Sequence, residues 1–379
     1  MLAALFLYNN TSQIDNDVTP LSLTRPLQRS NRTVQSLPGN FSLQGNSLQP
    51  GYHATQHPIH HVFYLKTHKT GSTTMFSILA EYCRSHDLLP LLPSKGQHFN
   101  VFRTYNPDTD VWRHPGLRVY DMMFNHHIFD RRILQHLHND TFRFTTIREP
   151  FQQFVSTFQF FINNFKDVPG PDRIGTFLSD PVKYDSREGR MSLVNNRQSM
   201  DLGYDMTHGF TDTEYIKQFI QQITEDFHLV LISDFYDESV VLLRRKLRWR
   251  TQDMLYFRKW EAKRKSRVAD NLSNDTQRAL HKRYAAADWA LYQHFLKIFK
   301  DQISNVPGLH EEVKEFKDVL QQVVEFCDSG RDDFKQLIIP PGQWTDQVSI
   351  IRSKCKWLKM NGRLFTLYLR NSTESRLAD

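Results

Sequence analysis

Cysteine is scarce in this chain: three residues among 379, at positions 83, 327 and 355. That number excludes a small disulfide-rich scaffold. One bridge at most is possible, and we expect Cys327 to pair with Cys355, leaving Cys83 as a buried thiol. A chain in which all three cysteines are reduced is the alternative.

Long apolar runs are also missing. The only apolar start, Met1–Tyr8, is about eight residues long, whereas a membrane span needs roughly 20. It is also too short for a secretory leader. Either the protein is cytosolic, or residues 1–8 are the remnant of a signal anchor. Sequons for N-glycosylation favour the anchor. They occur at Asn9, Asn10, Asn31, Asn40, Asn139, Asn271, Asn274 and Asn371.

Glycine and proline are too few for a collagen-like or linker-like chain, at 15 and 16 residues. The hydrophobic share of 39%, with 28 Phe, excludes a disordered chain, which could not bury enough apolar surface. The length allows roughly two to three domains. One large α/β domain with extensions fits equally well.

The polar residues 9–57, rich in Asn, Ser, Gln, Thr and Pro, predict a flexible stem. Beyond residue 58, strand-length apolar runs alternate with helical patterns, which predicts an α/β domain over 58–303: a P-loop-like parallel sheet flanked by helices. The expected strands are 61–65, 119–124, 142–147 and 228–232. Long helices are expected at 274–303 and 309–327, and residues 304–379 as a helical extension packed on the same domain.

The loop Lys66–Thr74 follows the first expected strand and opens a helix. Such a helix start, with Gly71 allowing close backbone approach, favours a bound anion. Lys69 precedes Gly71 by two residues, so the loop is not a Walker A motif. It indicates a pocket for a 5′-phosphate, and an ordinary capped helix start is the alternative.

A second phosphate element follows another expected strand. Arg148 stands at the end of that strand and Ser156 lies eight residues later in the next helix. A guanidinium group can bind phosphate through two hydrogen bonds, and a serine hydroxyl can add a third. Two phosphate sites on one sheet indicate a nucleotide phosphorylated at both ends of its ribose.

These motifs carry a family resemblance. Lys69-Thr70-Gly71-Ser72-Thr73 resembles the 5′-phosphosulfate loop of sulfotransferases, and Arg148 with Ser156 resembles their 3′-phosphate element. The string Phe63–Ser72 is similar to the galactose 3-O-sulfotransferase family. Further similar segments are Asp201–Asp205, Leu229–Ile232, Asp237–Ser239 and Asp288–Tyr292. The N-terminal anchor typical of the family is incomplete here, and Glu149 stands where a more neutral residue is expected.

The resemblance implies a sulfotransferase fold and 3′-phosphoadenosine 5′-phosphosulfate (PAPS) as sulfate donor, with no metal. The implied acceptor is the 3-hydroxyl of a terminal β-galactose on a glycolipid or glycoprotein glycan. The implied location is the Golgi membrane, as a single-pass type II protein with a lumenal catalytic domain. Rival interpretations are a sulfotransferase for a uronic acid or hexosamine, and a non-catalytic nucleotide- or glycan-binding relative.

We assign expected roles residue by residue. His68 is the first choice as general base, because an imidazole titrates near neutral pH. Lys69, assisted by Lys66, is expected to neutralise the leaving 5′-phosphate. His126 and His127 are alternative bases or sugar contacts, and a metal at this pair lacks a third ligand. The remaining candidates are Thr70, Gly71, Ser72, Thr73 and Thr74 for the donor, and Asp201 and Asp205 for sugar hydroxyls.

Positive charge is concentrated in one segment. Residues 244–267 hold eleven Lys and Arg against Asp253 and Glu261, so this segment carries +9 and the remaining chain −2. It is either a solvated face or a surface that steers an anionic nucleotide. Trp249 and Trp260 are expected to pack on the adenine, the sugar or neighbouring core. No nucleic-acid-binding motif accompanies this charge.

Overall fold

The computed structural model describes residues 57–99, 101, 105–113, 117–185, 192–209, 211–257, 275–329 and 336–378. The expected anchor remnant, nearly all of the expected stem, and residues 258–274 of the basic region lie outside these ranges. In the described part, no helix combines the length and apolar character needed to cross a membrane.

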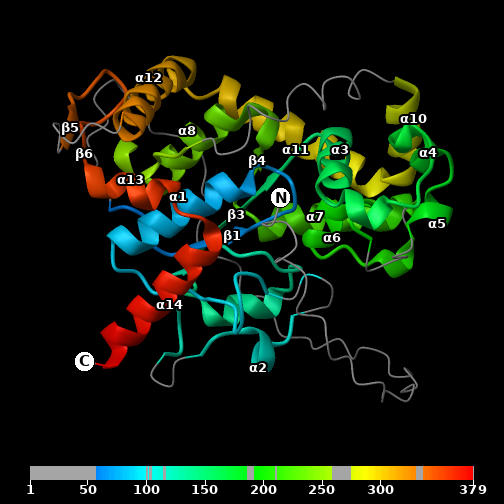
Figure 1. Cartoon of the computed structure of the whole chain (residues 1–379), viewed down its shortest axis with the longest axis horizontal. Helices are drawn as coiled ribbons and strands as arrows, with labels where there is room; N and C mark the ends of the chain where they lie inside the picture. The colour runs from blue at the N-terminus through cyan, green and yellow to red at the C-terminus, as the bar shows by residue number, and fades with distance from the viewer. Residues whose placement is uncertain are drawn as a thin grey trace. The chain divides into compact units, whose positions relative to one another are not determined.

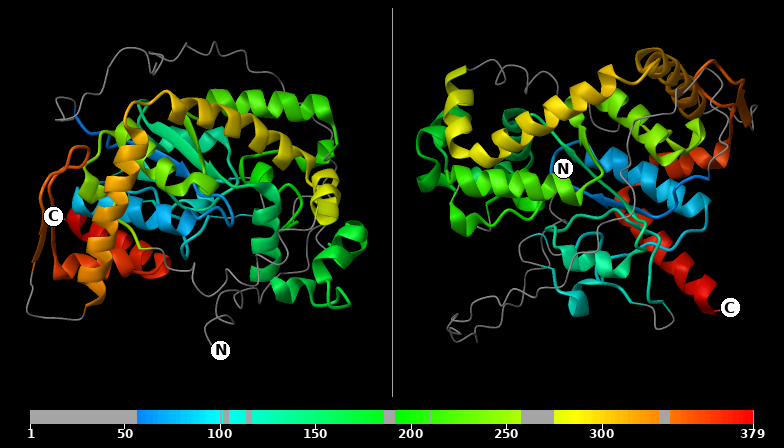
Figure 2. Two further views of the ribbon diagram at one scale, coloured as in Figure 1. Left: turned by 90° about the horizontal axis from the view of Figure 1, so that it is seen from above. Right: turned by 180° about the vertical axis from the view of Figure 1, so that it is seen from behind.

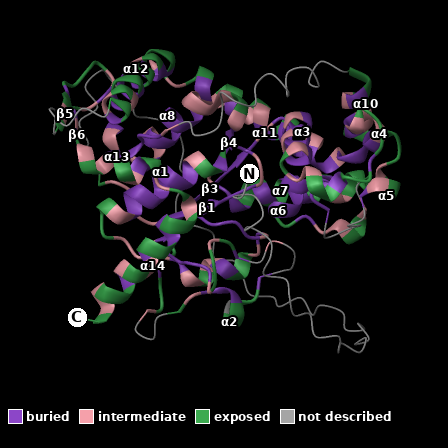
Figure 3. Cartoon of the chain, in the orientation of Figure 1, coloured by how far each residue is buried: buried purple, intermediate pink, exposed green. Residues whose placement is uncertain are grey.

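A four-stranded parallel sheet forms the centre of the fold (Figure 1). Its strands are β1 (Val62–Leu65), β2 (Met122–Met123), β3 (Phe142–Ile147) and β4 (Leu229–Ile232), in the order β2-β1-β3-β4. All four strands are buried along their whole length, as expected of a parallel sheet covered on both faces. Figure 3 shows these buried strands surrounded by helices with exposed outer faces. The predicted α/β class is confirmed.

Helices pack around this sheet (Figure 2). The helices that carry site residues or pack beside them are α1 (Ser72–Ser85), α3 (Pro150–Phe160), α4 (Arg173–Ser179), α5 (Pro181–Tyr184), α6 (Arg197–Asp201), α7 (Thr213–Asp226) and α8 (Tyr236–Leu247). The phenylalanine-rich α3 packs with α4 and α10 (Asp275–Tyr284) in a hydrophobic cluster separate from the main core.

The prediction of a single helix over 274–303 is wrong. The helix is interrupted at Ala285, which separates α10 (Asp275–Tyr284) from α11 (Ala286–Ser304). The break frees the first turn of α11 to meet a distant segment. The Asp288 backbone N–H donates to the Asn196 side chain at 3.0 Å, and the Asp288 carboxylate accepts from the Ser199 backbone N–H at 2.7 Å. The sequence pattern alone does not reveal this long-range cap.

Two other expectations need correction. The second strand is only two residues long, because Tyr120 pairs with Leu137 instead and regular pairing with β1 begins at Met122. The C-terminal extension is not purely helical. It contains α12 (Leu309–Asp328), an antiparallel pair of β5 (Gln336–Ile339) and β6 (Val348–Ile351), then α13 (Arg352–Lys359) and α14 (Gly362–Ala378). Helices α13 and α14 both contact α1.

The cysteines behave as expected. Cys327 at the end of α12 is bonded to Cys355 in α13, and Cys83 is a buried free thiol. Because the bridge closes a loop of 28 residues, Cys327→Ser is expected to lower the free energy of unfolding by about 3 kcal/mol. Urea denaturation of the oxidised protein measures this loss. An unchanged midpoint would show that the bridge does not constrain the unfolded chain.

Candidate active site

The loop after β1 is braced by its own hydroxyl groups. Thr70 and Ser72 are buried; the Thr70 Oγ1 lies 2.8 Å from the Thr67 Oγ1, and the Ser72 hydroxyl donates to the Thr67 carbonyl at 2.7 Å. These two of the four hydroxyl groups expected to contact a phosphate therefore hold the loop in shape. Thr73 is exposed and Thr74 half-buried at the start of α1, so their hydroxyls remain accessible.

The backbone of this loop turns sharply at two left-handed residues. Gly71, the N-cap of α1, has φ +75°, and Lys69 has φ +61°. A Cβ at Gly71 would lie 3.0 Å from the Tyr236 ring, so both its φ and its surroundings favour glycine. The turn presents the backbone N–H groups of Gly71, Ser72 and Thr73 in the manner of an anion-binding nest, whereas the Thr74 N–H donates to the Gly71 carbonyl at 3.0 Å.

Arg148 and Lys69 meet where β1 and β3 end. The Arg148 guanidinium donates to the Lys69 carbonyl at 3.3 Å and to the Gln152 side chain at 3.2 Å. Ser156 lies one helical turn beyond Gln152, on the same side of α3. The Lys69 ammonium sits 4.0 Å above the Phe160 ring. The structure thus brings the Arg148 side chain against the Lys69 backbone, and the helical spacing places Ser156 on the Gln152 side of α3.

The acidic residue Glu149 has a structural partner. Its carboxylate accepts from the Gln152 backbone N–H at 2.7 Å as the N-cap of α3. Its other oxygen pairs with the Arg278 guanidinium at 2.7 Å. Arg278, 129 positions away in the sequence, therefore neutralises the Glu149 charge. For this reason an acidic residue can stand beside the proposed anion site.

His68 is held by a buried carboxylate. Asp201, fully buried, accepts from the His68 backbone N–H at 2.8 Å and lies 2.8 Å from the ring Nδ1. Nδ1 faces this carboxylate at 2.8 Å and the Arg197 Nε and Nη2 donors at 3.3 and 3.1 Å, and the shorter carboxylate contact favours the tautomer with the proton on Nδ1 and a lone pair on Nε2. Arg197, also fully buried, donates to Asp201 at 2.8 Å and lies 3.1 Å from Nδ1.

Burial, followed by the Arg197 charge, lowers the pKa of His68 below its usual 6.5, while Asp201 opposes that shift. For Asp201, burial alone would raise the pKa, but the charge of Arg197 and the hydrogen bonds from His68 lower it overall. His68 is therefore neutral and Asp201 ionised near pH 7. This is the arrangement of a general base held in one tautomer by a carboxylate.

Asp201 was expected to bind sugar hydroxyls. Its carboxylate is fully buried and contacts His68 instead. Asp205 instead caps the short helix Met206–His208, accepting from the Thr207 backbone N–H at 3.0 Å. Sequence reasoning missed Arg197. The available signal was its i,i+4 spacing to Asp201, which places both residues on one helical face.

The two adjacent histidines after β2 occupy different environments. The His126 Nε2 lies 2.8 Å from the Lys66 ammonium, which also donates to the Ser72 hydroxyl at 3.1 Å. His127 is 1% exposed and packs edge-on against the Phe63 and Phe99 rings. It belongs to the core, and we do not carry it forward as a base or sugar contact.

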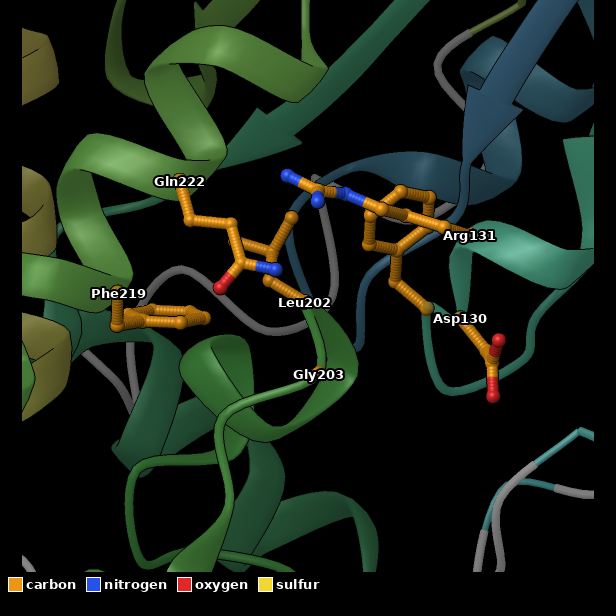
Figure 4. Close-up of a pocket in the computed structure, with 7 residues that line it drawn as sticks. Asp130, Arg131, Leu202, Gly203, Phe219 and Gln222 are labelled. Carbon is orange, nitrogen blue, oxygen red and sulfur yellow. The ribbon is translucent and has the colours of Figure 1, made fainter. Parts of the chain in front are cut away.

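A cavity of about 260 Å³ lies beside the residues that follow Asp201 (Figure 4). Gly203 forms part of its wall with φ +91°, and a Cβ there would lie 2.7 Å from the Phe129 carbonyl. The Phe129 backbone N–H donates to the Asp201 carbonyl at 2.8 Å, so the cavity wall and the His68 carboxylate share one segment. Phe219 and Gln222 of α7 supply an aromatic ring and an amide, a combination suited to a sugar.

Part of the basic segment is structural. Arg244 pairs with the buried Glu312 at 2.6 Å, and Arg245 contacts the same carboxylate. Trp249 stacks on Tyr82 and donates to the Ile59 carbonyl at 2.8 Å. These residues hold α8 to α12 and α1 instead of facing a nucleotide. Trp260 and the basic residues from 258 onward lie outside the described ranges.

Possible metal ligands converge elsewhere. Within the part of the chain that the structure describes, one group of donors lies close enough to share an ion: His61, His138 and Asp140. His61 precedes β1, and the other two precede β3, so the group lies at the amino edge of the sheet. The loop with Lys69 and His68 lies at the opposite, carboxyl edge.

The fold and site define an α/β protein with a cationic loop at a helix start and a carboxylate-held histidine at the carboxyl edge of its sheet, an arrangement suited to group transfer from a nucleotide. The chain matches the Galactose-3-O-sulfotransferase family over residues 24–338.

Individual proteins similar to this chain come from the same family. The chain is 31% identical to galactose-3-O-sulfotransferase 2 of Mus musculus over 285 residues, covering 71% of this chain and 70% of the relative. It is 32% identical to galactose-3-O-sulfotransferase 3 of Mus musculus over 280 residues, covering 70% and 63%. It is 32% identical to galactosylceramide sulfotransferase of Bos taurus over 247 residues, covering 63% and 56%. The chain belongs to the galactose-3-O-sulfotransferase family, and it is a carbohydrate sulfotransferase.

Proposed function

We propose that this protein transfers a sulfuryl group from PAPS to the 3-hydroxyl of a terminal β-galactose on a glycolipid or glycoprotein glycan. The observation that carries the proposal is the single loop that holds both kinds of group needed. Lys69 and the start of α1 form a cationic anion site, and His68, the preceding residue, is a neutral histidine held by Asp201. We assign this activity to residues 58–303.

The reaction requires a new bond from the galactose oxygen to sulfur and loss of the bond from sulfur to the 5′-phosphate oxygen. His68 Nε2 takes the proton of the attacking hydroxyl. Adenosine 3′,5′-bisphosphate leaves, and its 5′-phosphate gains negative charge in the transition state. Lys69, Lys66 and the backbone N–H groups of Gly71, Ser72 and Thr73 stabilise that charge, with the Thr73 and Thr74 hydroxyls beside them.

The 3′-phosphate of the donor is assigned to Arg148 and Ser156. Arg148→Ala is expected to raise the KM for PAPS about 30-fold with kcat changed less than threefold, because a charge-assisted contact remote from sulfur is lost. Initial rates at varied PAPS and saturating acceptor measure this. The matched control is Arg173→Ala in α4, whose guanidinium contacts the Val168 and Phe165 carbonyls. A changed acceptor KM with an unchanged PAPS KM would contradict the assignment.

The acceptor is tested with a panel. Radiolabelled PAPS is offered with galactosylceramide, N-acetyllactosamine, a mucin-type core galactoside, and a uronic acid and a hexosamine acceptor. Label in at least one galactose-terminated acceptor, and in neither of the last two, is the expected result. Transfer to the uronic acid or hexosamine alone would favour the rival acceptor class. Nucleotide binding without transfer to any acceptor would favour a non-catalytic relative.

We also propose a Golgi location, as a single-pass type II membrane protein with this domain in the lumen. Two observations support a secretory compartment. Disulfides such as Cys327–Cys355 persist in oxidising compartments. The sequon residues Asn139 and Asn371 are both exposed, as a glycosylated asparagine must be.

A further inference from the structure

Lys66 and His126 form a buried pair beside the donor loop. Lys66 is 7% exposed and His126 8%. The Lys66 ammonium lies 2.8 Å from His126 Nε2 and donates to the Ser72 hydroxyl at 3.1 Å. The other ring nitrogen, His126 Nδ1, lies 2.6 Å from the Lys66 backbone carbonyl. The ring thus contacts the same lysine through both its main chain and its side chain.

These contacts fix the proton on the ring. A carbonyl only accepts a hydrogen bond, so Nδ1 must carry the proton and Nε2 must be the acceptor for the Lys66 ammonium. Burial, followed by the charge of Lys66, lowers the pKa of His126 well below 6.5, which keeps this neutral tautomer. The Nε2 lone pair is engaged by Lys66, so it is not free for an incoming sugar hydroxyl.

We propose that His126 is a positioning residue that fixes the Lys66 ammonium at the mouth of the donor loop, where it contacts the 5′-phosphate of the nucleotide. Two of the three ammonium N–H groups are held by His126 and Ser72, which leaves one to meet the phosphate. The inference rests on the proposed function and names His126 as a determinant of donor binding.

Holding this ammonium matters because its surroundings disfavour its charge. Burial, followed by the nearby Lys69, lowers the pKa of Lys66 to about 7. An imidazole nitrogen that accepts from the ammonium stabilises its charged form, and so does a bound phosphate. Lys66 needs acceptors at fixed places, and His126, at the shorter distance, and the Ser72 hydroxyl supply them in the native fold.

The competing role for His126 is that of general base. Its ring stacks on His68 with centroids 4.3 Å apart, so both rings lie near the same point. The two roles differ in measurable ways. Loss of a base lowers kcat and leaves nucleotide affinity intact, whereas loss of a group that positions Lys66 weakens nucleotide binding.

Three single variants of the full chain separate these roles. His126→Gln places an amide oxygen near the Nε2 position, where it can accept from Lys66. His126→Asn replaces only the Nδ1 donor and leaves the ammonium without that acceptor. His127→Asn alters the neighbouring buried histidine, whose ring nitrogens have no hydrogen-bond partner among the described residues, and serves as the matched control. The dissociation constant of adenosine 3′,5′-bisphosphate is measured by calorimetry, together with kcat and the acceptor KM.

His126→Asn is expected to weaken nucleotide binding about tenfold, the usual cost of one hydrogen bond to a charged group. We expect His126→Gln to stay within threefold of native affinity and His127→Asn within twofold, with the acceptor KM unchanged in all three. Equal losses in the asparagine and glutamine variants, or an equal loss in His127→Asn, would overturn the proposal. So would a fall in kcat with full nucleotide affinity, which would identify a base.

Should His126→Asn not fold, the glutamine variant and the control still decide: tight binding by both supports the proposal, and weak binding by the glutamine variant overturns it. If the native protein does not bind the nucleotide, the proposed function itself fails.

Discussion

His68→Ala is expected to lower kcat for sulfate transfer about a thousandfold while the affinity for adenosine 3′,5′-bisphosphate changes less than threefold. General bases contribute roughly 10²- to 10⁴-fold, and a sugar hydroxyl is a weak nucleophile without one. The nucleotide is held by other groups of the loop, so its binding survives. Steady-state kinetics with saturating PAPS and calorimetry with the bisphosphate measure the two quantities. Loss of nucleotide affinity with an unchanged kcat would contradict the assignment of the base.

Asp201→Asn probes the same base through its partner. The variant removes the negative charge that opposes the lowering of the His68 pKa by burial and by Arg197. Activity is lost as pH falls through the pKa of His68, so the acidic limb of the kcat/KM profile moves to lower pH. The plateau drops as well, because the amide no longer fixes the tautomer. Asp212→Asn, at the exposed N-cap of α7, is the control and should leave the profile in place.

Lys69→Met is expected to lower kcat/KM for PAPS about 10³-fold. The ammonium stabilises charge that grows on the 5′-phosphate as the bond to sulfur breaks, and removal of one such group usually costs 10²- to 10³-fold in kcat. Ground-state binding of the dianionic phosphosulfate falls too, which adds to the loss in kcat/KM. Transfer of labelled sulfate at subsaturating PAPS measures the change.

Lys183→Met is the matched control for Lys69. Each lysine places its ammonium above an aromatic ring, Lys69 over Phe160 at 4.0 Å and Lys183 over Tyr184 at 5.0 Å. Lys183 lies in α5 and is exposed. Activity close to native in both variants would show that the loop does not bind the leaving phosphate, and circular dichroism establishes that both are folded.

Local sequence patterns predicted the parts of the fold that depend on neighbouring residues. The third strand was predicted with its observed bounds, Phe142–Ile147, because a buried parallel strand reads as a short apolar run. The convergence of Lys69 and Arg148 was predictable as well, since parallel strands end at one edge of the sheet. The break at Ala285 was not, because Asn196 caps α11 from 92 positions away.

The chemistry of the site was predictable only in outline. His68 and Lys69 were found because they stand in one short loop. The partner of His68 is Asp201, 133 residues later, and the partner of Lys66 is His126, 60 residues later. Such pairings depend on tertiary packing, which single-sequence patterns do not encode. The same holds for Glu149, which looks out of place in sequence and is neutralised by Arg278.

The most direct test of the account locates the sulfate on the product. The native protein is incubated with PAPS and a galactose-terminated acceptor, and the purified product is analysed by two-dimensional NMR. We expect one sulfate on the 3-hydroxyl of the terminal galactose, formed in equal amount with adenosine 3′,5′-bisphosphate. Sulfate on another hydroxyl or another sugar, or nucleotide cleavage without sulfation, would contradict the account.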